Sequence, residues 1–210
     1  IEALGQRLPA GAREIDARGK LVLPGGIDSH CHIDQARAAG PAFADDFASG
    51  TTSAAYGGNT CIISFTPHFK GKAIKPFVED YHRRAGKAVI DYSFHITVTD
   101  PSEHVLSKEL PELISSGYRS IKIFMTYDSN FITDRQILDV LGVAREHGAF
   151  VVVHAENHDS IRWLTERLEA AGLTAPKYHA YAKPAVVERE AIHRIIALSE
   201  LVDQPIEIFH

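Results

Sequence analysis

Two histidines separated by one residue follow an apolar run near the start of the chain. They are His30 and His32, in the segment Asp28-Ser29-His30-Cys31-His32. Side chains at positions i and i+2 of a strand point to the same side. Both imidazoles would therefore project together at the carboxyl end of a strand, where parallel α/β folds hold their active sites. Such a pair is a natural start for a zinc site, although two histidines at a strand edge without metal fit this motif alone equally well.

A lysine lies in the middle of the apolar segment Ser120-Ile121-Lys122-Ile123-Phe124-Met125-Thr126. A buried lysine is costly unless it is paired or chemically altered. Because Ile121 and Ile123 share the face expected to pack on helices, Lys122 would point to the functional side of the sheet. Between two cations it would lose its proton easily, and the neutral amine could take up carbon dioxide and bridge both metals as a carbamate. The alternative is a strand-end lysine that reaches solvent.

Two further histidines, His154 and His210, each close an apolar strand-like run. Taken singly, such a residue is more often part of the core or rim than a metal ligand. In a barrel, however, the carboxyl ends of parallel strands surround one mouth, so ligand-type residues from four separate strands would converge there. The convergence predicts a metal site with these ligands: His30, His32, Lys122, His154 and His210.

Short apolar runs rich in Val, Ile and Phe alternate with amphipathic stretches along the chain. The runs predict buried strands at residues 21–27, 61–66, 92–99, 120–126, 150–154 and 205–210. Between them, Asp100 before Pro101 predicts the cap of a helix that Gly117 stops. Thr133 and Gln136 have capping-box spacing. The stripe of Ile137, Val140, Leu141 and Ala144 then ends at Gly148, and Val187, Ala191, Ile195, Leu198 and Val202 form a similar stripe after Pro184.

Alternating strands and helices predict a parallel sheet covered by helices. Two architectures fit, a doubly wound open sheet and a (β/α)8 barrel seen up to its sixth strand. No glycine-rich phosphate-binding fingerprint follows the first strand, which disfavours a nucleotide-binding doubly wound module. Residues 1–20 have the character of a separate small β element.

The composition is that of an ordinary globular domain, with 45% hydrophobic and 23% charged residues and a net charge of −5 over 210 residues. The mild acidity and the absence of a basic cluster lead us to expect neither nucleic acid nor membrane as a partner. Two cysteines, Cys31 and Cys61, suit a reducing compartment and predict a cytoplasmic location. Because the chain opens without methionine and ends on a strand-like run, we expect a piece of a longer protein.

The motifs together resemble the metal-dependent amidohydrolase superfamily and, within it, the dihydropyrimidinase/hydantoinase family. The matching segments are residues 21–35 (LVLPGGIDSHCHIDQ), 45–60 (DDFASGTTSAAYGGNT), 121–128 (IKIFMTYD), 151–157 (VVVHAEN) and 205–210 (PIEIFH). The resemblance implies a (β/α)8 TIM-type barrel, truncated after strand six, over residues 25–210. Residues 1–24 would be the remnant of an N-terminal β-sandwich domain.

The resemblance also implies roles for single residues. His30 and His32 would bind one divalent metal, carboxylated Lys122 would bridge two, and His154 and His210 would bind the second. We expect Zn²⁺, although the ligand set also suits manganese or cobalt. Three further residues would act on the substrate: Tyr127 as the group that supports the oxyanion, and Phe124 and Phe131 as apolar walls of the pocket. For both phenylalanines, a plain core position is almost as good an explanation.

The implied activity is hydrolytic ring opening of dihydropyrimidines or 5-substituted hydantoins by a hydroxide shared between two metals, in a homotetramer. Allantoinase and dihydroorotase are related alternatives, but dihydroorotase-like proteins are expected to have an arginine at the position of Asp34. A non-catalytic scaffold protein is a third alternative. Such proteins are expected to have lost metal ligands. The family's proton-shuttling aspartate would come after the last strand of this chain, so we expect the chain by itself to be inactive.

Overall fold

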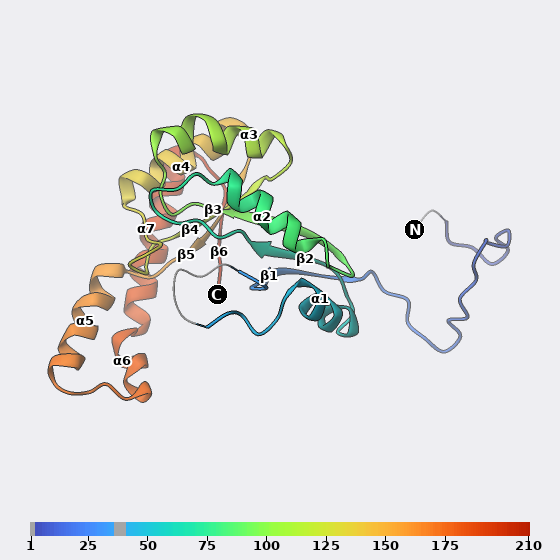
Figure 1. Ribbon diagram of the computed structural model, residues 1–210, viewed down its shortest axis with the longest axis horizontal. Helices are drawn as coiled ribbons and strands as arrows, with labels where there is room; N and C mark the ends of the chain where they lie inside the picture. Colours follow the sequence, from blue (N-terminus) through green and yellow to red (C-terminus); the bar gives the residue numbers. More distant parts are fainter. Residues whose placement is uncertain (1–2, 36–40) are drawn as a thin grey trace.

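The computed structural model describes residues 3–35 and 41–210 and contains one sheet of six parallel strands (Figure 1). The strands are β1 (Gly26–Cys31), β2 (Asn59–Phe65), β3 (Asp91–Thr97), β4 (Ser120–Phe124), β5 (Phe150–His154) and β6 (Ile206–Ile208). The helices are α1 (Phe47–Tyr56), α2 (Lys75–Ala85), α3 (Leu110–Ser115), α4 (Asp134–His147), α5 (His158–Ala170), α6 (His179–Ala182) and α7 (Ala185–Val202), with a π-helical turn η1 (Val105–Glu109) and a 3₁₀ turn η2 (Pro176–Tyr178).

The strand order distinguishes between the two predicted architectures. Each strand pairs in parallel with its neighbour in the chain, so that the order is β1-β2-β3-β4-β5-β6. A doubly wound sheet would reverse its order at a switch point. The unbroken order is that of a (β/α) barrel, and the sheet curls into part of one. The predicted barrel, truncated after strand six, is confirmed.

The first strand begins later than the apolar pattern predicts. The expected strand at residues 21–27 is wrong in its position, since β1 covers Gly26–Cys31. Leu21 and Leu23 are 88% and 74% exposed and pair with no strand. Pairing begins only where Gly26 lies opposite Asn59, and an added side chain at Gly26 would collide with the Asn59 amide. As a result, the polar sequence before His32 is itself the strand.

The helix ends predicted from local sequence are confirmed for α4 but not for the helix expected after Asp100. The capping box predicted at Thr133 is present, with Thr133 accepting from the Gln136 N–H and the Gln136 side chain accepting in return. Gly148 ends α4 in the left-handed conformation with φ 71°. The cap predicted at Asp100 is wrong, because its carboxylate accepts from the N–H of Gly71 in the loop after β2.

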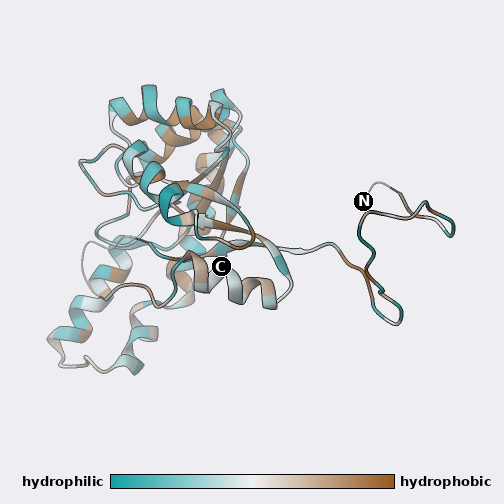
Figure 2. Ribbon diagram, turned by 45° about the vertical axis from the view of Figure 1, so that its right-hand side comes forward, coloured by the Kyte–Doolittle hydropathy of each residue, from teal (hydrophilic) through white to brown (hydrophobic). Residues whose placement is uncertain are grey.

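The main core lies between the outer face of the sheet and the helices. The α4 stripe predicted from the sequence is completely buried there, together with Ile121 and Ile123 on β4. Ala191 and Ile195 join the same core from α7, and Val187 in its first turn is also buried. Figure 2 shows the apolar colouring concentrated on the strands and the helix sides that face them. This packing turns the alternate residues of β4, including Lys122, to the inner face of the curled sheet.

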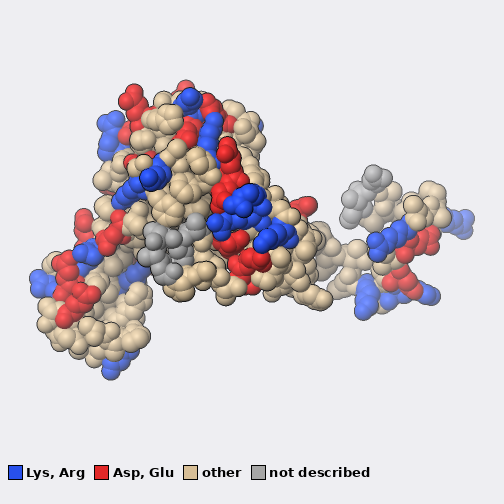
Figure 3. Space-filling model, viewed as in Figure 1, with Lys and Arg blue, Asp and Glu red and all other residues tan. Residues whose placement is uncertain are grey.

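Other parts of the chain project from this body. Described residues 3–25 contain no helix or strand and extend away from the sheet, while α5 and α6 project on another side (Figure 1). The assignment of residues 1–24 to a separate β domain stays a prediction, and residues 1–2 lie outside the described residues. Lys and Arg side chains are interspersed with Asp and Glu on the face that Figure 3 shows. None of the helices in the described ranges has both the length and the apolar character of a membrane span.

Replacing Ile123 by alanine should reduce stability, because the side chain is fully buried between the sheet and its helices. We expect Ile123→Ala to lower the free energy of unfolding by about 2–5 kcal/mol, measured by urea denaturation of the full-length protein. The matched control is Ile196→Ala on α7, where the side chain is 41% exposed and the change should stay within about 0.5 kcal/mol. Equal losses in both variants would contradict this assignment of the core.

Candidate functional site

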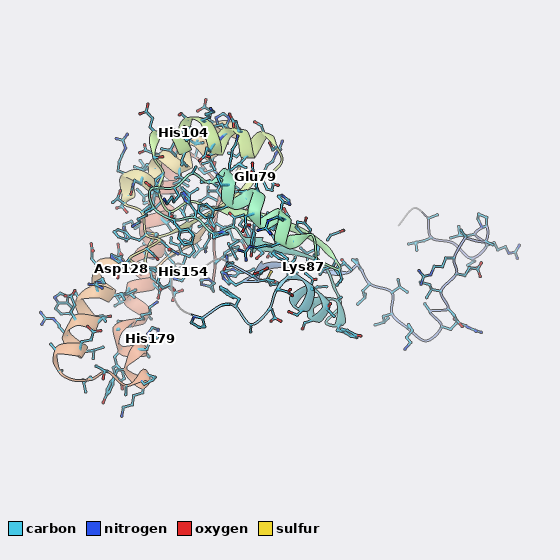
Figure 4. All side chains as sticks on the ribbon, in the orientation of Figure 1. Glu79, Lys87, His104, Asp128, His154 and His179 are labelled. Carbon is cyan, nitrogen blue, oxygen red and sulfur yellow. The ribbon has the colours of Figure 1, made fainter. Side chains whose placement is uncertain are left out.

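A cavity of about 690 Å³ opens at the carboxyl ends of the strands. Seven of the residues selected from the sequence line it: His30, His32, Lys122, Phe124, Tyr127, His154 and His210. They come from β1, β4, β5 and the segments that follow these strands and β6. Figure 4 labels His154 in the body of the molecule, while His104 and His179 lie toward its periphery. The fold thus brings together all five side chains proposed as metal ligands.

The four histidine rings of the cavity contact one another in a row. Ring centroids are 5.4 Å apart for His30 and His32, 4.8 Å for His30 and His210, and 4.8 Å for His210 and His154. Each pair meets edge to face. Within residues 3–35 and 41–210, no three His, Cys, Asp or Glu side chains are arranged so that they could hold a metal ion. The four histidine side chains proposed as metal ligands are therefore close together, but in the structure their rings pack on one another.

The protonation of His32 is fixed by a neighbour. Its Nδ1 lies 2.8 Å from Gln35 Oε1, while Gln35 Nε2 donates to the Phe65 carbonyl at 2.6 Å. Since the Gln35 amide nitrogen is used on that carbonyl, its oxygen can only accept, so Nδ1 of His32 carries the proton. Burial lowers the pKa of His32, with Lys122 and His210 acting in the same direction. The neutral ring therefore keeps a lone pair on Nε2 for a metal.

The same reasoning applies to His154 at the end of β5. Its Nε2 lies 2.6 Å from Glu156 Oε2, and a carboxylate only accepts, so Nε2 carries the proton and Nδ1 is the free donor. Burial lowers the pKa of His154 despite this contact. Burial disfavours the charged form of Glu156, but hydrogen bonds from Lys183 (2.8 Å) and His154 outweigh it and lower the pKa of its carboxyl. Carboxylate partners of this kind orient metal-binding histidines.

Lys122 is buried without a partner. Its side chain is 1% exposed, and its Nζ is the one buried side-chain nitrogen or oxygen of the described residues that lacks a hydrogen bond. Three aromatic rings surround it, with centroids 4.7 Å away for Phe124, 4.9 Å for Phe209 and 5.5 Å for Phe65. Burial lowers the pKa of Lys122 from 10.5 to about 7, so a substantial fraction of the amine is neutral at neutral pH.

His30 experiences the same environment. Burial, followed by the nearby Lys122 and the other histidines, lowers the pKa of His30 to about 4. The ring is therefore neutral at physiological pH and able to donate a lone pair to a metal.

The residues chosen as substrate contacts separate into two groups. Phe124 and Tyr127 line the cavity, and the Tyr127 ring centroid is 5.0 Å from that of His154. Tyr127 has φ 71°, a left-handed conformation that costs a non-glycine residue about 1–2 kcal/mol. Phe131 is not among the lining residues, because it stacks on His158 at 4.1 Å with Lys70 on its ring. The role of Phe131 as a wall of the substrate pocket therefore stays a prediction.

The sequence reasoning overlooked several groups around the cavity. Gln35 and Glu156 follow histidines by three and two residues, a spacing that could have identified them as partners of these rings. His95 on β3 is 4% exposed, with Nε2 donating to the Ser29 carbonyl at 2.8 Å. Asp34, considered from the sequence as a substrate-facing position, instead pairs with Arg84 at 3.0 Å and does not line the cavity.

Known proteins resemble this chain over its whole length. A D-hydantoinase of Geobacillus stearothermophilus is 44% identical over 214 residues, covering 100% of this chain and 45% of that protein. A dihydropyrimidinase of Rattus norvegicus is 38% identical over 218 residues, covering 100% of this chain and 42% of the relative. The chain thus spans less than half the length of these curated relatives. No protein-family model matches it.

Solved structures give the same result. A D-hydantoinase structure superposes with a TM-score of 0.92 at 41% identity, over 98% of this chain and 45% of that one. The crystal structure of a dihydropyrimidinase from Brevibacillus agri superposes with a TM-score of 0.85 at 42% identity, over 90% of this chain and 41% of the other.

The buried amine of Lys122 should make stability depend on pH. With metal and carbon dioxide removed, the unfolded chain holds the lysine proton up to pH 10.5 and the folded chain only up to about 7. The folded state is therefore penalised by up to about 5 kcal/mol at and below pH 7, and this penalty disappears as pH rises to 10.5. Lys122→Met should be more stable than the parent near pH 7, with the difference shrinking at higher pH, as measured by urea denaturation. A difference independent of pH, or one also seen for the exposed control Lys20→Met, would contradict the assignment.

Proposed function

Because this chain belongs to the D-hydantoinase and dihydropyrimidinase family, we propose that the protein containing it hydrolyses a C–N bond in a cyclic amide or imide. The proposed substrates are dihydropyrimidines and 5-substituted hydantoins, which open to the corresponding N-carbamoyl acids. The printed names of the relatives support this substrate class. A cytoplasmic location and a homotetrameric assembly are parts of the same proposal.

The observation that carries the proposal is the partnerless amine of Lys122 beside a row of four histidine rings. A buried lysine with no acceptor costs free energy, and no hydrogen bond in the structure offsets this cost. The neutral amine can remove this cost by adding carbon dioxide, which forms a carboxylate on Nζ and releases a proton. That modification would give Lys122 the bridging role between two metals.

The donor set fits divalent metals of the zinc type. His30 and His32 would hold one ion, His154 and His210 the other, and carboxylated Lys122 both. In support, the free nitrogens derived for His32 and His154 are Nε2 and Nδ1, and each has its second nitrogen engaged by Gln35 or Glu156. Two such ions lower the pKa of a bound water toward neutrality and polarise a carbonyl.

The chain's own side chains would then act on the ring. Tyr127 is 42% exposed at the mouth of the cavity, where its hydroxyl would donate to the oxygen of the ring carbonyl as negative charge develops there. Phe124, stacked on His154 with centroids 5.9 Å apart, would form an apolar wall against the ring substituent. Its ring centroid also lies 4.7 Å from the buried Lys122 amine.

Ring opening by the full-length protein tests the proposal directly. Loaded with zinc in the presence of bicarbonate, it should open dihydrouracil and 5-substituted hydantoins but not dihydroorotate or allantoin, as measured by loss of ring absorbance. Lys122→Ala should reduce turnover at least about 10³-fold and lower bound metal, because the bridge is lost. His104→Asn, an exposed histidine at the periphery, is the control and should retain activity and metal.

Two results would argue against the proposal. Turnover of dihydroorotate or allantoin alone would move the protein to another branch of cyclic amidohydrolases. No turnover of any of the four substrate types, combined with no bound metal, would favour a scaffold protein.

Tyr127→Phe isolates the contribution of one hydroxyl, since the ring and its contact with His154 remain. Loss of an oxyanion donor should lower kcat about 10²–10³-fold, with a smaller change in KM because the hydroxyl acts mainly in the transition state. Steady-state kinetics on dihydrouracil measure both. Tyr56→Phe is the control, since Tyr56 is 91% exposed. A kcat within about threefold of the parent would remove Tyr127 from the mechanism.

A further inference from the structure

We propose that Lys183 is a positioning residue that holds Tyr127 against the metal-ligand side of the cavity, using Glu156 as its anchor. The inference rests on the proposed role of Tyr127 and adds a residue that the sequence reasoning did not consider. Lys183 lies between α6 and α7, far in the chain from the strand ends that carry the proposed ligands.

The anchor is an ion pair of low exposure. Lys183 Nζ donates to Glu156 Oε2 at 2.8 Å, and the same oxygen accepts from His154 Nε2 at 2.6 Å. The three side chains are 20%, 17% and 12% exposed, respectively. At this depth the pair is screened less than an ordinary surface salt bridge. One carboxylate oxygen thus ties Lys183 to the histidine that ends β5.

The second contact of Lys183 is with the ring of Tyr127. Its Nζ is 5.0 Å from the Tyr127 ring centroid, within the range of a cation–π interaction. The other neighbour of that ring is His154, with centroids 5.0 Å apart. Tyr127, Glu156 and Lys183 also line a second cavity of about 180 Å³ next to the main one. The ring is therefore held between an ammonium and an imidazole that share one carboxylate.

The backbone around Lys183 fixes where its side chain begins. The N–H of Asn157, next to Glu156, donates to the Val187 carbonyl in the first turn of α7 at 3.0 Å. This bond joins the segment after β5 to the start of α7, and Pro184 restricts the chain between them. Lys183 is thus presented to Glu156 from a fixed position, which reduces the entropy lost on forming the pair.

Tyr127 needs such support because of its backbone. It has φ 71°, and its carbonyl accepts the N–H groups of Asn130 and Phe131 at 2.8 Å each, forming a tight turn. A left-handed tyrosine persists only where its surroundings hold it. Without the ammonium, one side of the ring loses its partner, and the turn should open more often.

The first test measures the turn without using activity. In Lys183→Met, which keeps the apolar stem and removes the charge, we expect the amides of Asn130 and Phe131 to exchange hydrogen about 5–10-fold faster in the full-length protein. Lys183→Arg should restore protection, since a guanidinium can make both contacts. The matched control is Lys177→Met, because Lys177 is exposed and has a similar contact with the Tyr178 ring at 5.1 Å. Unchanged exchange in Lys183→Met, or equal acceleration in the control, overturns the proposal.

The second test uses a double-mutant cycle on ring opening. Lys183→Met should lower kcat about 10-fold while KM stays within about threefold and bound zinc is unchanged. In the Tyr127→Phe background the same change should cost less than about twofold, because the hydroxyl that Lys183 positions is already gone. A 10-fold loss in both backgrounds overturns the proposal, because Lys183 would then act elsewhere.

The two experiments separate this proposal from the proposed function. If the parent turns over none of the cyclic amides, the proposed function fails, and hydrogen exchange alone decides whether Lys183 holds the turn. If the parent is active and Lys183→Met matches it in both exchange and kcat, the function stands and the positioning role is rejected.

Discussion

The burial of one amine without a hydrogen-bond partner is the constraint on which the site depends. Lys122 is placed on the inner face of β4 because its neighbours Ile121 and Ile123 are completely buried on the outer face. The strand cannot rotate to release the amine without exposing those side chains, and each would cost a few kcal/mol. The aromatic rings around Nζ supply no acceptor. Packing of the helices on the outer face of the sheet therefore keeps the Lys122 amine buried without a partner. Carbon dioxide and metal ions are chemically suited to remove the resulting electrostatic cost.

The second property of the site is that the histidine nitrogens are already assigned. Gln35 and Glu156 each engage one nitrogen of a ring and leave the other free. Neither partner belongs to the proposed ligand set, yet each decides which ring nitrogen keeps its lone pair. Because burial keeps these rings neutral, metal binding would not first have to displace a proton from them. The structure thus pre-organises the donors even though the rings pack on one another in it.

The loop that carries Tyr127 is contacted by charged side chains from distant parts of the chain. Tyr127 is held in a left-handed turn, with Lys183 on its ring and His154 beside it. Its neighbour Asp128 meets Arg162 of α5 at 3.2 Å, with both side chains more than half exposed. Such exposed pairs contribute little, so the partly buried Lys183–Glu156 pair is the stronger support of the turn. Chemistry at the mouth would therefore depend on α5 to α7 as well as on the strands.

Much of the fold could be predicted from local patterns. Alternating apolar runs gave five of the six strands at nearly their observed positions, and the capping box at Thr133 begins α4 as expected. The first strand was misplaced because Leu21–Leu23 have strand-like composition but no neighbour to pair with, whereas the polar stretch around His30 does. Apolar composition identifies a strand only when burial follows, and burial depends on the partner.

By itself, the sequence determined which ligand-type residues end which strands, since residue type and strand periodicity are local properties. Only the tertiary structure decided that the strands run in barrel order, that Phe131 packs on His158 outside the cavity, and that the amine of Lys122 has no partner. It also decided which nitrogen of His154 is free, because Glu156 is held in part by Lys183, 27 residues further along the chain. These properties depend on contacts between segments distant in sequence, and local sequence patterns do not predict which segments come into contact.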